Sequence, residues 1–132
     1  MQRMTVSLPD DVAEAFEAWS RERGYQNRSE AFRDLVREAV SRQAEAEPEG
    51  RGMGVLSYVY DHHERRLSER MTEHQHDAGD LVHSVMHVHV SHDECLEAVF
   101  LKGDSEAVLG FAKSVLAQPG VKHGKFNFIP QE

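Results

Sequence analysis

Hydrophobic and polar residues alternate at the start of the chain and then change to a helical spacing. Residues 2–8 alternate with a period of two, which is typical of a strand with one exposed face. Apolar residues then recur every three or four positions. This spacing predicts an amphipathic helix that begins after Pro9 and ends near Gly24.

A second helix is expected from about Asn27 to about Arg42. Asn27 and Glu30 have the spacing of a capping box. The predicted buried stripe of this helix consists of Phe32, Leu35, Val36, Ala39 and Val40. One strand and two helices are too few to close a core alone, and an unpaired strand edge needs a neighbour. The pattern therefore predicts an intertwined homodimer joined by a two-stranded antiparallel ribbon.

The second half of the chain has an alternating order of strands and helices. Residues 43–54 are polar and contain glycine and proline, so they are interpreted as a linker. The elements expected after it are strand 55–60, helix 63–74, strand 81–90, strand 95–102, helix 105–117 and strand 121–129. The order βαββαβ is that of the ferredoxin-like fold. We therefore predict an α+β protein with one domain over 1–47 and another over 53–132.

Composition restricts the possible partners and compartment. The chain has 15 Lys+Arg against 23 Asp+Glu, a net charge of -8. Any contact with DNA must therefore be local, because nonspecific binding depends on Lys and Arg at phosphates. No apolar run reaches the roughly 20 residues of a membrane span, and the first residues do not resemble a secretory signal. A single cysteine excludes an internal disulfide, so a cytoplasmic location is expected.

The polar face of the first strand has side chains that can read DNA. A two-stranded ribbon fits the major groove, and this ribbon would present Arg3, Thr5 and Ser7. The start of the second helix, at Arg28 and Ser29, offers backbone N–H groups to a phosphate. Alternation alone is more typical of a strand face that is merely solvated. The strand–helix–helix order, with its capped second helix, favours the DNA-binding interpretation.

Histidines gather in one part of the chain, and eight of the nine lie within residues 62–92. His87 and His89 are two positions apart on a predicted strand, so their imidazoles share a face, and His83 has the same parity. Cys95 follows a predicted turn, which allows the three side chains to converge across a hairpin. Imidazole and thiolate suit nickel, copper and zinc. Three ligands leave a fourth position for water or for a side chain from elsewhere.

Both halves of the chain resemble known families. The stretches Met4–Pro9, Arg23–Tyr25 and Asn27–Ala31 resemble a ribbon-helix-helix domain, a family that binds operator DNA as dimers. The stretches Leu56–Tyr60, His87–Glu97, Leu101–Asp104 and Val121–Gly124 closely resemble the NikR-type nickel-responsive regulators. That second resemblance extends over essentially the full chain with matching spacing.

The resemblance implies an architecture and a metal site. It implies a homotetramer, a dimer of dimers, in which two ribbon-helix-helix dimers flank a core of four ACT-like βαββαβ domains. The second domain would thus serve both metal sensing and tetramerisation. The partner would be double-stranded operator DNA. The implied Ni(II) site is square-planar and lies between subunits. Its ligands would be His87, His89 and Cys95 of one chain and His76 of a neighbouring chain.

Further roles are implied by the same resemblance. Tyr60 and Glu97 would join the hydrogen-bond network around the metal. His62 lies where the family has a residue associated with additional metal binding, although a surface histidine fits the pattern as well. This sequence departs from the family in its shorter histidine run, where His74 is a conceivable substitute for His76. It also has Glu64-Arg65 in place of a basic pair, which should weaken nonspecific DNA contact.

Two acidic residues on the second helix have two explanations. Glu30 and Asp34 are four positions apart, so they repel unless they are paired or bind a cation. They can pair with Arg33 or Arg37. The resemblance instead implies an alkali cation, such as potassium, between the domains. Backbone carbonyls around Leu116, Gln118 and Val121 would complete that site.

The sequence as a whole predicts a nickel-dependent transcriptional regulator that represses nickel uptake when Ni(II) binds. A sensor of copper or cobalt with the same fold is an alternative, because affinity alone favours copper over nickel. A metal storage or delivery protein is another, although it has no use for the polar strand face. A hydrolytic enzyme with an open metal position is disfavoured, since no general base is fixed beside the ligands. We therefore expect no enzymatic activity.

Overall fold

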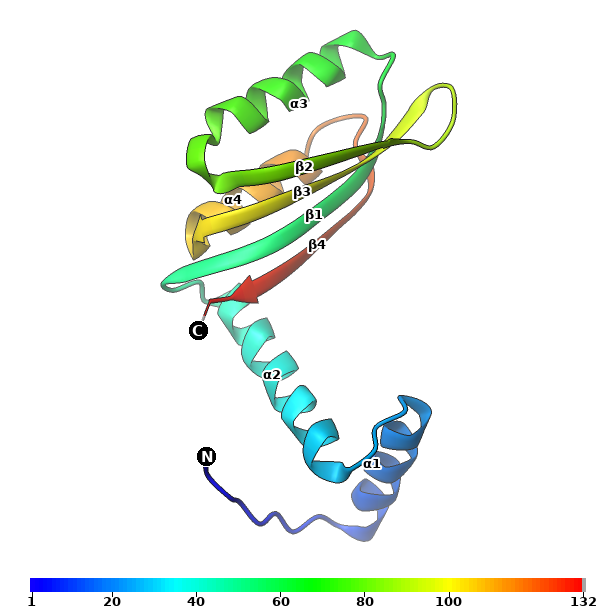
Figure 1. The fold of residues 1–132 in the computed structure, drawn as a ribbon, viewed down its shortest axis with the longest axis vertical. Coiled ribbons are helices and arrows are strands. Elements are labelled where there is room, and N and C mark those ends of the chain that lie inside the picture. Colours follow the sequence, from blue (N-terminus) through cyan, green and yellow to red (C-terminus); the bar gives the residue numbers. More distant parts are fainter. Residues whose placement is uncertain (132) are drawn as a thin grey trace. The chain divides into compact units, whose positions relative to one another are not determined.

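The computed structural model describes residues 1–131, with the side chains of residues 65–68 left out. The chain divides into two compact units, Met1–Val40 and Ser41–Glu132. Each unit is described by itself (Figure 1).

The first unit consists of an extended start and two helices, α1 over Asp10–Glu22 and α2 over Arg28–Ala46, which continues into the second unit. The predicted end of α1 is confirmed, because Gly24 adopts a φ of 77° that favours glycine. The predicted cap is confirmed as well. The backbone N–H of Glu30 donates to Asn27 Oδ1 at 2.9 Å, which satisfies one free amide of the helix start.

Two predictions for the first unit are not met in the single chain. Residues 2–8 form no strand, because strand pairing requires a neighbouring strand that this unit does not supply. The predicted buried stripe of α2 is largely exposed: Phe32 is 42% exposed and Val40 55%. In the described part of this unit only Ser20 and Ala31 are buried. Both differences have the same physical reason, which is that about 40 residues cannot enclose a core by themselves.

The second unit has the predicted βαββαβ order. Its elements are β1 (Arg51–Asp61), α3 (Arg65–Asp77), the short 3-10 helix η1 (Gly79–Leu81), β2 (Val82–His89), β3 (Glu94–Asp104), α4 (Ser105–Leu116) and β4 (Lys122–Pro130). The four strands form one antiparallel sheet in the order β2-β3-β1-β4 (Figure 1). This order places β3 and β1 at the centre and leaves β2 at an edge.

The core lies on one face of this sheet. Alternate residues of β1 and β3 are buried there, and they contact apolar residues of both α3 and α4. The buried set includes Leu56, Tyr58, Met71, Cys95, Val99, Val108 and Val115. On the opposite face large apolar side chains are exposed, among them Met86, Val88, Leu96, Phe100 and Ile129. The sheet therefore has one face covered by helices and one apolar face that is uncovered in the single chain.

The predicted linker is wrong in its extent. Helix α2 continues to Ala46 and β1 begins at Arg51, so the connection between them is only residues 47–50. Gly52 and Gly54 of the predicted linker lie within β1, where they mark close packing instead of a flexible connection. A Cβ on Gly54 would lie 2.3 Å from Phe126 Cε1, and one on Gly52 would lie 2.5 Å from Phe128 Cε2. Glycine is needed there because the aromatic rings of β4 lie directly over the backbone of β1.

Candidate metal centre and nucleic-acid surface

Two imidazoles and a thiol meet across the β2–β3 hairpin. The register places His87 opposite Glu97 and His89 opposite Cys95, so these side chains emerge on the same face. Cys95 Sγ lies 3.0 Å from His87 Nε2 and 3.7 Å from His89 Nδ1. Donor atoms that share one ion at bond lengths of about 2.0–2.3 Å lie about 3–4 Å apart. Cys95 Sγ is therefore close enough to each imidazole to share with it a transition metal that accepts nitrogen and sulfur ligands.

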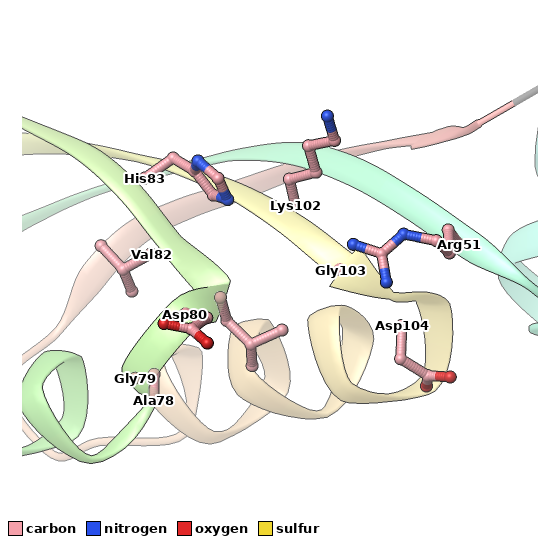
Figure 2. Close-up of a pocket in the computed structure, with 10 residues that line it drawn as sticks. Arg51, Ala78, Gly79, Asp80, Val82, His83, Lys102, Gly103 and Asp104 are labelled. Atoms are coloured by element: carbon pink, nitrogen blue, oxygen red, sulfur yellow. The ribbon is translucent and has the colours of Figure 1, made fainter.

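His83 does not join this cluster, although its parity in the sequence suggested the same face. His83 lies four positions from His87, about 13 Å along a strand, and a register shift between Val82 and Ser84 also breaks the alternation of β2 there. His83 instead lines an open hollow of about 680 Å³ at the far end of β2. Figure 2 shows the charged side chains around that hollow, which are Arg51, Asp80, Lys102 and Asp104. Among the described residues, no group of three metal donors lies in it.

The surroundings of Cys95 favour the neutral thiol in the absence of a cation. Cys95 is fully buried, and burial raises the pKa of its thiol. The carboxylates of Glu97 and Asp61 raise that pKa further. Because the thiolate is the form that binds metals, a bound cation would offset this cost with its own charge.

Glu97 connects the metal donors to helix α3. Its side chain is buried, and Oε2 lies 3.6 Å from His87 Nδ1, the ring nitrogen that faces away from Cys95. Gln75 donates from Nε2 to Glu97 Oε1 at 2.5 Å and to the Tyr58 hydroxyl at 3.3 Å. Burial and the Glu97 carboxylate raise the pKa of both Tyr58 and Tyr60, which keeps the two phenols protonated.

Gln75 and Tyr58 are functional candidates that the sequence did not reveal. Tyr58 is two positions from Tyr60 on β1, so the alternation of the strand could have placed both side chains on the same face. Gln75 carried no signal, because only the packing of α3 on the sheet brings its amide to the carboxylate of Glu97.

The two histidines considered for the fourth ligand lie elsewhere in the chain. His76 is exposed in the last turn of α3 and belongs to neither of the donor groups found among the described residues. His74 faces α4, where its Nε2 lies 3.0 Å from Gln118 Nε2 and its ring lies near Phe111. A fourth ligand from a neighbouring chain therefore stays a prediction for His76.

His62 lies next to the metal donors. Its ring is 4.8 Å from that of His89, and His62, His89 and Cys95 have ligand atoms within 4.8 Å of one another. The ring of His62 also lies against that of His63, tilted by 35° at 4.1 Å between centroids. The role of His62 in additional metal binding stays a prediction, but its ring lies close enough to reach an ion there.

The residues expected to contact DNA are exposed in the first unit. Arg3, Thr5 and Ser7 lie in the extended start of the chain. Arg28 and Ser29 form the first turn of α2, where backbone N–H groups are free of helical partners. The guanidinium of Arg28 is paired with Glu17 of α1, so a phosphate would have to compete with that carboxylate.

The acidic pair of α2 is partly explained by local partners. Asp34 Oδ2 accepts a hydrogen bond from the Tyr25 hydroxyl at 2.8 Å, and Asp34 Oδ1 lies 3.4 Å from Arg37 Nη1. The hydrogen bond that Tyr25 donates to Asp34 raises the pKa of the Tyr25 hydroxyl. A cation at Glu30 and Asp34 would have to share Asp34 with these two partners.

The fold and the donor cluster define an α+β protein with a candidate transition-metal site. A family model described as the NikR C terminal nickel binding domain matches residues 53–129, which is more than half of the chain. A model described as a ribbon-helix-helix protein of the copG family matches residues 2–43. The chain therefore belongs to the NikR family and carries a ribbon-helix-helix domain before its nickel-binding domain. No helix within the described residues is long and apolar enough to cross a membrane.

Proposed function

We propose that the chain is a nickel-dependent transcriptional regulator that holds Ni(II) through His87, His89 and Cys95. The observation that carries this proposal is the separation of Cys95 Sγ from the two imidazole nitrogens, 3.0 and 3.7 Å. Bound there, Ni(II) supplies positive charge that stabilises the buried thiolate. Glu97 orients the His87 ring through its other nitrogen, and Gln75 holds Glu97 in place. These contacts link the metal donors to α3, so filling the site should order that helix.

We further propose that His76 of a neighbouring chain completes the site in a homotetramer. Two observations support an interface at this edge. His87 lies on the edge strand β2 and keeps 41% of its side chain exposed, which leaves room for another ligand. The uncovered face of the same sheet is apolar, with Met86 61% and Phe100 42% exposed, and such a surface is favourably buried against another copy. Metal binding would then depend on how the subunits are arranged.

The DNA-binding step is proposed to use paired N-terminal segments. The exposed apolar residues Met4, Val6 and Leu8 favour a ribbon between two copies, which would turn Arg3 and Thr5 outward toward the major groove. Nickel would favour the subunit arrangement that spans both operator half-sites and so repress nickel uptake. An alkali cation at Glu30 and Asp34 would hold that arrangement. Exchanging potassium for tetramethylammonium should then weaken operator binding.

Copper or cobalt sensing and metal storage remain the competing functions. A thiolate with two imidazoles accepts copper as readily as nickel, so the donors alone do not select the metal. Storage requires no DNA binding at all. A copper or cobalt sensor would respond in its DNA affinity to a metal other than nickel. A storage protein would show no change of DNA affinity with any metal. No enzymatic step is proposed.

The deciding experiment is a DNA-binding titration of the full chain. Binding sites are selected from a random duplex library with Ni(II) present, and the affinity for the selected DNA is then measured with Ni(II), Cu(II), Co(II) or a chelator. A coupling of about 1–3 kcal/mol predicts roughly 5–150-fold tighter binding with nickel. Cys95→Ser is the matched variant and should lose most of this gain. Equal affinity of the wild-type chain with and without nickel would contradict the proposal.

A spectroscopic measurement checks the metal site separately. Ni(II) bound to the wild-type chain should give a thiolate-to-nickel charge-transfer band and the spectrum of a low-spin square-planar centre. Cys95→Ser should abolish the band. A tetrahedral spectrum would contradict the proposed square-planar geometry.

A further inference from the structure

The hollow of about 680 Å³ lies at the far end of the β2–β3 pair, away from Cys95. Three segments line it, which are the start of β1, the connection from α3 through η1 into β2, and the end of β3 (Figure 2). Its volume falls within the roughly 300–1,000 Å³ that is typical of small-molecule sites. Lys102 on its rim is seven positions along β3 from Cys95, roughly 23 Å. The hollow is therefore separate from the metal donors.

The backbone gives the hollow a defined shape. The register shift between Val82 and Ser84 leaves His83 without a partner in β3, and the side chain of His83 lines the hollow. On the opposite wall Gly103 lets η1 approach β3, since a Cβ there would lie 2.6 Å from Leu81 Cδ2. Leu81 in turn packs against the hydrophobic core. The walls are thus formed before any ligand arrives, which reduces the entropic cost of binding one.

Two permanent positive charges line this hollow without a counter-charge. Arg51 and Lys102 are exposed, and neither takes part in the ion pairs found among the described residues. Arg51 stands opposite Asp104 in the register, but that carboxylate caps α4 by accepting a hydrogen bond from the Ala107 N–H at 3.2 Å. In Figure 2 the Asp104 carboxylate points away from the Arg51 guanidinium. A bound anion would supply the missing counter-charge.

The side chains also indicate the chemistry of such an anion. The planar guanidinium of Arg51 can donate two parallel hydrogen bonds to one carboxylate, and the ammonium of Lys102 suits a second. His83 adds a ring N–H as a further donor. Asp80, on η1, is an acceptor and repels a simple anion, but it can accept a hydrogen bond from a ligand hydroxyl.

We propose that this hollow binds a small dicarboxylate that carries a hydroxyl group. Arg51 and Lys102 hold its two carboxylates, and Asp80 accepts from its hydroxyl. The chain as a whole has a net charge of -8, so two unpaired cations on neighbouring strands form a local exception in a field that otherwise repels anions. Because these side chains are exposed, each charge pair contributes little, and a dissociation constant on the order of 1 mM is expected. This site goes beyond the proposed nickel and operator binding and does not depend on either.

Saturation-transfer NMR on the full, metal-free chain tests this site. L-Malate is the probe, and succinate, which lacks only the hydroxyl, is its comparison. Metal must be absent because malate itself binds Ni(II). Malate should bind roughly fivefold more tightly than succinate, since only malate can donate to Asp80.

Three variants assign the contacts. Arg51→Gln should weaken malate binding about tenfold or more, because it removes a charged, two-pronged donor. Lys125→Gln is the matched control, since it removes one positive charge at an exposed residue of β4 outside the hollow, and it should bind malate as the wild type does. Asp80→Ala should tighten succinate binding, because it removes a repulsive charge, and should abolish the preference for malate.

The outcomes separate this inference from the proposed function. The inference is overturned by a wild-type chain that shows no saturation transfer to malate up to about 10 mM, or by equal affinities for malate and succinate. Arg51→Gln that binds malate as the Lys125→Gln control does overturns it too. If malate does not bind but Arg51→Gln weakens DNA binding and lowers its salt dependence, these cations contact DNA phosphates instead. Malate binding by a chain whose DNA affinity ignores nickel keeps this site and contradicts only the proposed function.

Discussion

Gln75 provides the sharpest test of how helix α3 and the metal donors are connected. Its amide donates to the buried Glu97 carboxylate at 2.5 Å and to the Tyr58 hydroxyl at 3.3 Å, and Glu97 faces His87. Gln75→Ala removes a hydrogen bond to a charged, desolvated group. Such a bond contributes about 1.5–3 kcal/mol, and we expect the free energy of unfolding to fall by about that amount.

The same substitution should lower nickel affinity. Glu97 without its donor is less firmly held beside His87, and the loss of a supporting group at a metal site costs about 10–100-fold in affinity. Gln75→Glu should be worse than Gln75→Ala at neutral pH, because it sets a second carboxylate against Glu97. The order wild type, Gln75→Ala, Gln75→Glu is therefore expected for both stability and nickel affinity.

Urea unfolding at fixed protein concentration and a nickel titration against a competing chelator measure the two effects. Glu73→Ala is the control, because Glu73 is an exposed residue of the same helix. If Gln75→Ala matches this control in both assays, the connection from α3 through Glu97 to His87 does not operate. A loss of stability with unchanged nickel affinity would restrict the network to a structural role.

Single positions elsewhere test the sheet and the first unit. Gly54→Ala should destabilise the chain by about 1–3 kcal/mol, because its Cβ would overlap a Phe126 ring. In α4, a Cβ on Gly110 would meet nothing within 4 Å, so Gly110→Ala should stabilise the chain by about 0.5–1 kcal/mol. If thermal unfolding shows that the two substitutions change stability in the same direction, the packing argument is contradicted. Arg3→Ala should weaken binding to selected DNA by about 1–3 kcal/mol and leave the nickel band unchanged, and unaltered DNA affinity would exclude the strand face as the reading surface. Val36→Glu, at a side chain 45% exposed in the single chain, should lower self-association in sedimentation, and an unchanged oligomer would place the interface elsewhere.

Local pattern determined most of the secondary structure. The order of elements in the second unit follows from periods of two and three to four residues, which record which face of each element is buried. The capping residue Asn27 and the end of α1 near Gly24 were readable because each depends on a few neighbouring residues. The placement of His87, His89 and Cys95 on one face was readable for the same reason, since a hairpin brings near neighbours in sequence together.

Tertiary structure decided the features that depend on contacts between distant segments. Gly52 and Gly54 read as linker residues, because the sequence does not show that rings of β4 lie over them. His83 left the face of His87 through a register shift that alternation cannot reveal. Gln75 meets Glu97 only because α3 packs on the sheet, and His63 meets Asp93 only because two loops are joined by backbone hydrogen bonds. The periodicity of a segment shows which face is apolar, while packing decides whether that face is buried and which partners it meets.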